Sequence, residues 1–168
     1  MKTEGLNREE IIARIADFHG HLGPCVLFGF RAGQLALREL EAKGYFDLEA
    51  DVFCGTRPPL SCFADGVQLG SGCTAGKGNL RFATSDSGKL EAVVIFRRRA
   101  ASGPVGGLAA STVTIRIKPE IEALAAKWLA EVGDIDTARR QLALGDEEVF
   151  LVERSSGAWP HQTPGGSR

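Results

Sequence analysis

Two segments of this 168-residue chain alternate apolar and polar residues, and both lie between stretches with helical periodicity. The first spans residues 46–54 and the second spans 113–117, and a period of two is typical of half-buried strands. Two further apolar runs, at 80–83 and 90–96, flank Ser85-Asp-Ser-Gly-Lys89, which predicts a hairpin. Strands that pair by a hairpin, with helices before and after them, predict an α+β single domain with a mixed or antiparallel sheet flanked by helices.

Helix start and stop signals place the remaining elements. Asn7 and Glu10 have the form of a capping box, and the helix that they begin is predicted to stop at His19-Gly20. The other expected helices cover residues 25–43, 61–69, 119–132 and 136–144, and a short final strand is expected at 149–152.

Length and composition favour one core domain over residues 1–154, followed by a flexible tail rich in Pro, Gly and Ser at 155–168. The formal net charge of −1 provides no field that would recruit nucleic acid or an anionic membrane. The N-terminus has no apolar signal-peptide region, and no apolar run approaches the ~18 residues of a membrane span. These features predict a soluble, cytoplasmic protein, in which four cysteines are better interpreted as ligands, thiolates or core residues than as disulfides.

The first candidate site is Phe18-His-Gly-His-Leu-Gly-Pro24, which contains two of the three histidines. In an extended segment, residues two apart project to the same side, so His19 and His21 can converge on one point. Imidazole is a common ligand for zinc, iron, copper and nickel, and it is also a general base near neutral pH. The structural alternative is that both histidines only cap helix ends.

The second candidate site begins on the short helix at 61–69. Cys62, Asp65 and Gln68 are three apart and share roughly one face, where a thiol, a carboxylate and an amide need polar partners. Cys73 follows in the glycine-rich loop 70–79. Two thiolates and two imidazoles would make a chemically reasonable zinc or ferrous site, whereas a single buried cysteine is also an ordinary core residue.

The loop Gly72-Cys-Thr-Ala-Gly-Lys-Gly78 resembles a phosphate-binding loop only superficially. Its spacing is too short, and Gly78 stands where Ser or Thr must reach magnesium. Backbone N–H groups together with Lys77 could hold a small anion, and the alternative is a plain tight turn with a solvated lysine. Three consecutive arginines at 97–99 are interpreted as a solvated strand end, because no aromatic residues are interleaved with them.

These motifs occur in an order that resembles the formylmethanofuran dehydrogenase E-subunit family over about residues 8–153. The resemblance implies an α+β core domain, often dimeric, whose pocket of cysteines and histidines holds a metal, usually zinc. It implies His19, His21, Cys62 and Cys73 as metal ligands, surrounded by Asp65, Gln68 and Lys77. Some relatives carry a C-terminal zinc finger, which is expected to be absent here because no cysteine follows Cys73.

One position departs from the pattern of many relatives, which read His-Gly-His-x-Cys-Pro-Gly. This chain has Gly23-Pro24-Cys25 instead, as a variant within the family does, so the thiol at position 23 is missing. A four-ligand site is therefore weighed against three protein ligands plus water. Whether Cys25 or Cys54 joins the site stays open, with Cys54 expected in the core or beside the site.

The functional prediction is a metal-binding protein, with zinc first and iron second, whose pocket takes a small, anionic ligand. In an enzymatic version, Asp65 or a histidine would move a proton, and Lys77 with the loop N–H groups would stabilise negative charge, with Gln68 beside them. The alternative is a non-enzymatic accessory or regulatory subunit with a structural or sensor metal. A third hypothesis is a reactive Cys73 with a histidine base. A homodimer and oxidoreductase partner subunits are also expected.

Overall fold

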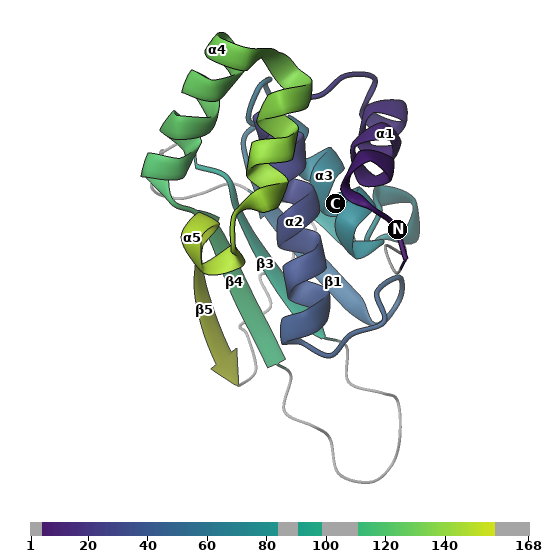
Figure 1. Ribbon diagram of the computed structural model, residues 1–168. Coiled ribbons are helices and arrows are strands. Elements are labelled where there is room, and N and C mark those ends of the chain that lie inside the picture. Colours follow the sequence, from purple (N-terminus) through teal and green to yellow (C-terminus); the bar gives the residue numbers. More distant parts are fainter. Residues whose placement is uncertain (1–4, 84–90, 99–110, 157–168) are drawn as a thin grey trace, which may run out of the picture.

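The computed structural model describes residues 5–83, 91–98 and 111–156. Its elements in chain order are α1 (Arg8–His19), α2 (Pro24–Glu39), β1 (Leu48–Phe53), α3 (Cys62–Ser71), the 3-10 turn η1 (Ala75–Lys77), β2 (Leu80–Phe82), β3 (Val93–Arg98), β4 (Ser111–Ile117), α4 (Pro119–Ala143), α5 (Asp146–Val149) and β5 (Phe150–Ser156). Figure 1 shows α2 lying across one face of the sheet, between α3 and α4. The prediction of an α+β domain with a mixed sheet and flanking helices is confirmed.

The five strands are arranged in the order β2-β1-β3-β4-β5. β1 pairs in parallel with β2 and antiparallel with β3, and the β3–β4 and β4–β5 pairs are antiparallel. The predicted hairpin between 80–83 and 90–96 is therefore wrong, because β1 lies between these two strands. The turn residues predict only that the chain reverses. β1 takes the position between β2 and β3 because its side chains Leu48, Ala50 and Val52 are fully buried. The turn signal at 85–89 lies outside the described residues.

Glycines bring α2 and α3 into backbone contact. A Cβ added at Gly29 would lie 2.0 Å from the carbonyl oxygen of Phe63, and a Cβ at Gly66 would lie 2.0 Å from that of Val26. One turn further along each helix, a Cβ at Gly33 would lie 2.6 Å from a backbone nitrogen of α3. Contacting residue numbers rise together along both helices, so the helices run parallel and their N-termini lie at the same end.

An apolar cluster and an ion pair hold α1 against α4, near the N-terminal ends of α2 and α3. Ile12 and Ile15 of α1 pack in a second apolar cluster with Ala138 of α4. On the surface of this contact, the Arg139 guanidinium donates to both carboxylate oxygens of Glu9, at 2.8 and 2.9 Å. The two helices predicted at 119–132 and 136–144 are one element, α4, interrupted at Gly133 (φ 77°). The turn after α1 is thereby fixed against the ends of α2 and α3.

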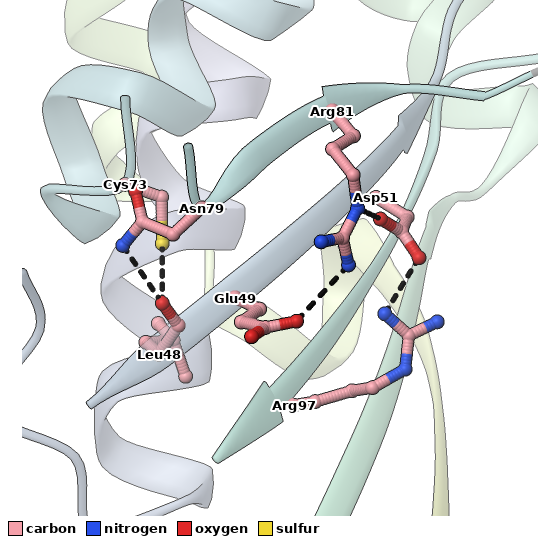
Figure 2. A network of polar contacts seen from close by, with 7 residues as sticks. All are labelled: Leu48, Glu49, Asp51, Cys73, Asn79, Arg81 and Arg97. Carbon is pink, nitrogen blue, oxygen red and sulfur yellow. Dashed lines mark hydrogen bonds and ion pairs between the residues drawn. The ribbon is translucent and has the colours of Figure 1, made fainter. Parts of the chain in front are cut away.

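The sheet face opposite the helices carries ion pairs. The carboxylate of Asp51 accepts from Arg81 at 2.8 Å and from Arg97 at 2.5 Å, and Glu49 accepts from Arg81 at 3.0 Å (Figure 2). Part of the arginine run is therefore neutralised within the sheet, which differs from the predicted solvated strand end; Arg99 lies outside the described residues. In the described part of the chain, no helix is both long and apolar enough to cross a membrane.

Candidate metal centre

The turn between α1 and α2 carries both histidines of the first motif. His19 is the last residue of α1, and Gly20 ends the helix with a φ of 86° that favours glycine. The imidazole rings of His19 and His21 lie with their centroids 4.4 Å apart and their planes inclined by 38°. His21 is exposed, whereas the His19 side chain is 8% exposed. The two rings thus lie side by side, one buried and one at the surface. Their convergence was predicted for an extended segment, whereas here His19 is helical and the left-handed backbone of Gly20 turns the chain between the two rings.

Cys62 joins these histidines from α3. It is the first residue of that helix and is half-buried. One candidate ligand atom from each of His19, His21 and Cys62 can be chosen so that all three lie within 4.8 Å of one another. Residues about 40 positions apart in the chain meet here because the parallel contact of α2 and α3 puts the start of α3 beside the turn that precedes α2.

Asp65 fixes the buried ring. Its Oδ2 lies 2.8 Å from Nδ1 of His19, and the Asp65 side chain is 49% exposed. An ionised carboxylate can only accept, so this contact favours the tautomer with the proton on Nδ1 and the lone pair on Nε2. Nε2 of His19 is buried and has no hydrogen-bond partner. A buried acceptor without a partner is costly, and His19 belongs to the group with His21 and Cys62 that could hold a metal ion.

In the absence of a cation, the surroundings of Cys62 favour its thiol over its thiolate. Burial raises its pKa, and the nearby Asp65 carboxylate raises it further. A divalent cation reverses this effect, because a metal favours the thiolate over the thiol. The donor set of two imidazoles and one thiol, with a carboxylate behind one imidazole, fits zinc or ferrous iron.

Cys25 and Cys54 lie in the core behind this group. Burial raises the pKa of Cys25 to about 12 and that of Cys54 to about 11. The expectation that Cys54 is a core residue or lies beside the site is confirmed, since it is 1% exposed. Both thiols are therefore neutral packing groups at physiological pH.

Cys73 and Lys77 lie elsewhere. Cys73 follows the C-terminal end of α3, and a 10-residue helix is about 15 Å long, so the structure does not bring Cys73 to Cys62. The buried Cys73 thiol donates to the Leu48 carbonyl at 3.4 Å, beside the Asn79 amide, which donates to the same oxygen at 2.9 Å (Figure 2). Nζ of Lys77 donates to the Thr74 hydroxyl at 2.9 Å. In the described structure the glycine-rich loop holds β1 and β2 together.

Gln68 is half-buried on α3, one turn after Asp65. Of the seven site residues inferred from the sequence, the structure thus brings together four: His19, His21, Cys62 and Asp65. The contact of Asp65 with His19 was not predicted. Its signal in the sequence was the spacing of three between Cys62 and Asp65, which puts both on one helix face.

The exposures of the four thiols predict an order of alkylation. In metal-free protein at mildly alkaline pH, we expect iodoacetamide to modify Cys62 first, because the other three cysteines are buried. Added zinc should protect Cys62. Peptide mass spectrometry after short exposures measures this order, and modification of Cys73 before Cys62 would contradict it and favour the hypothesis of a reactive Cys73.

Comparisons with known proteins bear on the fold and the family of this chain. A solved tungsten formylmethanofuran dehydrogenase FmdE-like protein from Syntrophus aciditrophicus matches with a TM-score of 0.59 and 19% identity, over 99% of this chain and 82% of that one. This likeness establishes the fold alone.

Two sequence comparisons add to the structural match. A protein of Archaeoglobus fulgidus described as a probable S-adenosyl-L-methionine-binding protein is 35% identical over 95 residues, which are 53% of this chain and 24% of that protein. The chain thus matches about a quarter of the length of this relative. The family model described as "FmdE, Molybdenum formylmethanofuran dehydrogenase operon" matches residues 18–149, from the histidine turn to the end of α5. The chain belongs to the FmdE family.

Proposed function

We propose that this protein binds one metal ion, zinc in preference to iron, through Nε2 of His19, an imidazole nitrogen of His21 and the thiolate of Cys62. The fourth position is left to water or a small ligand. One observation carries the proposal: Nε2 of His19 is buried and unpartnered while Asp65 occupies the other ring nitrogen. Structural zinc sites usually have four protein ligands, whereas three protein ligands plus water are typical of catalytic zinc.

When bound, such a metal supplies a Lewis acid or activates a water molecule. The chain's own residues define what surrounds it. Asp65 orients the His19 ring, Cys62 contributes a negative charge that lowers the charge of the site, and His21 lies at the solvent side. Phe18, which is 46% exposed, provides apolar surface next to His19 in the chain. This arrangement favours a small polar ligand that enters past His21.

The proposal is tested by titrating metal-free protein, purified without a histidine tag, with zinc in a calorimeter and with ferrous iron under anaerobic conditions. We expect about one zinc per chain. Zinc should bind more tightly than ferrous iron, because most sites made of nitrogen, oxygen and sulfur ligands bind zinc with the higher affinity. No saturable binding of either metal would refute the proposal.

Replacing Asp65 tests how the ring is held. We expect Asp65→Ala to weaken zinc binding about 10- to 100-fold, the usual cost of losing the partner that orients a histidine ligand. Asp65→Asn should lose less, because the amide oxygen can still accept from Nδ1–H. Gln68→Ala, one turn along the same helix, is the matched control and should leave zinc affinity unchanged. Equal affinities of Asp65→Ala and wild type would show that Asp65 does not position the ligand.

The archaeal relative makes S-adenosyl-L-methionine a second ligand to examine, since 35% identity over 95 residues is the observation that favours it. Calorimetric titration of metal-free and zinc-loaded protein with this compound is the test. Binding that requires zinc would place the compound at the metal, and binding that is independent of zinc would place it elsewhere on the chain. Dimerisation and oxidoreductase partner subunits likewise remain proposals, which sedimentation and copurification can test.

A further inference from the structure

The first turn of α2 lies beside the three side chains proposed as metal ligands. Gly23 is its N-cap residue, with extended backbone (φ −157°, ψ 155°), and it provides no side-chain acceptor. A Cβ built at Gly23 would lie 4.0 Å from Nε2 of His21, so the start of this helix lies next to the His21 ring. Pro24, the first helical residue, has no N–H, which leaves those of Cys25 and Val26 as the donors of this turn.

Unlike those of α2, the N–H groups at the start of α3 already have acceptors. The N–H groups of Cys62, Phe63 and Ala64 donate to carbonyls of the preceding turn, at 3.2, 3.0 and 3.0 Å. They are therefore already satisfied, although the positive end of the α3 dipole still faces the site. The parallel packing of α2 and α3 points both positive ends at the same place, where an anion is favoured.

The unpartnered Nε2 of His19 is an independent sign of a ligand at this site. The His19 side chain is 8% exposed, and its ligand atom lies in the group formed with His21 and Cys62. His21 is the exposed member of this group, and the start of α2 lies next to it.

The charges of the site limit the charge of the ligand. A divalent metal, one thiolate and the Asp65 carboxylate sum to zero formal charge, and the end of a helix adds about half a positive charge. A singly charged anion fits this balance. Lys77, the cationic residue that the sequence predicts for this site, donates to Thr74 on another part of the fold, so it does not supply a second positive charge for a phosphate ester.

We propose that the ligand of this site is a small carboxylate, held both by the metal and by the N–H groups of the first turn of α2. The inference rests on the proposed metal site. A planar carboxylate has two oxygens, so one can bind the metal while the other accepts from the N–H groups of the first turn of α2. Gly23 is then a specificity-determining position, because it leaves these N–H groups free. A side-chain acceptor placed there would occupy the N–H groups that the carboxylate needs.

The test uses acetate as the probe and zinc-loaded protein, with chloride at equal ionic strength as the reference. We expect acetate to shift the amide resonances of Cys25 and Val26 in a saturable way. Gly23→Ser should weaken acetate binding about fivefold or more, because a serine N-cap hydroxyl accepts from these N–H groups with about that strength. Gly23→Ala adds the same Cβ without the hydroxyl and should weaken acetate binding clearly less than Gly23→Ser does.

Zinc stoichiometry and circular dichroism are measured on the same samples. Intact zinc binding without an acetate-dependent shift at Cys25 and Val26 would overturn the carboxylate inference and leave the metal site standing. Equal weakening in Gly23→Ser and Gly23→Ala would also overturn it, because sterics rather than the N–H groups would then explain the loss. Failure to bind zinc at all would instead refute the proposed metal site. The shift in the unmodified protein remains decisive if a variant does not fold.

Discussion

Cys62→Ala will abolish zinc binding at concentrations that saturate the unmodified protein, whereas Cys73→Ala will bind zinc normally. Of these two cysteines, only Cys62 lies in the group with His19 and His21. Cys73 lies beyond the other end of α3, where its thiol donates a hydrogen bond to the carbonyl of Leu48. Loss of one of three ligands should lower affinity by more than about 100-fold, since removing a partner behind a ligand already costs about 10- to 100-fold. Calorimetric zinc titrations of the two variants measure the difference.

The same pair of variants separates an open site from a structural one. Cys62 is half-buried at the rim of the core, so Cys62→Ala should keep the fold, as monitored by circular dichroism and thermal unfolding. If Cys62→Ala unfolds and zinc removal unfolds the unmodified protein, the accessory-protein hypothesis with a structural metal gains support. Loss of zinc from Cys73→Ala with an intact fold would instead return Cys73 to the ligand set that the family resemblance implies.

Gly66→Ala will be the most destabilising alanine substitution among the glycines of α2 and α3, together with Gly29→Ala. The added Cβ would lie 2.0 Å from a carbonyl oxygen in each variant, and neither backbone can move without separating the two helices. We expect the free energy of unfolding to fall by about 3 kcal/mol or more, the upper end of the cost of overpacking. Urea unfolding monitored by circular dichroism measures this change.

Gly76→Ala is the matched control for these substitutions. Gly76 is exposed, and a Cβ there would meet nothing within 4 Å, so its free energy of unfolding should change by less than about 0.5 kcal/mol. Since the close helix contact also positions Cys62, surviving Gly66→Ala protein should bind zinc more weakly. A stable Gly66→Ala variant with normal zinc affinity would show that the contact of α2 with α3 does not determine the site.

Much of the fold could be predicted from local patterns. The capping box of Asn7 and Glu10 is present in full, and α1 ends at His19 as the following glycine predicts. The period of two located β1 and β4 within two residues of their ends. Local patterns could not predict the strand order. The pairing of β1 with both β2 and β3 depends on which strand is buried most deeply, and this is a property of the whole sheet.

The candidate site divides along the same line. The convergence of His19 and His21 agrees with the structure, although it was predicted for an extended segment and arises at the left-handed glycine that ends α1. The helical spacing of Cys62 and Asp65 predicted a shared face, which also agrees with the structure. Cys73 lies 11 residues after Cys62, close to three helical turns, so periodicity alone could not exclude it from that face. The length of α3 separates the two thiols, and this separation requires knowing that the helix continues to Ser71.

Two histidines and one cysteine are proposed to hold a metal whose fourth position is open. Cobalt(II) substitution tests it most directly, because the visible spectrum reports coordination number and the ultraviolet sulfur-to-cobalt band counts thiolates. We expect a tetrahedral spectrum with the charge-transfer intensity of one thiolate, lost in Cys62→Ala, kept in Cys73→Ala and altered when a small ligand such as azide is added. Two thiolates, or a spectrum that no added ligand alters, would contradict the account.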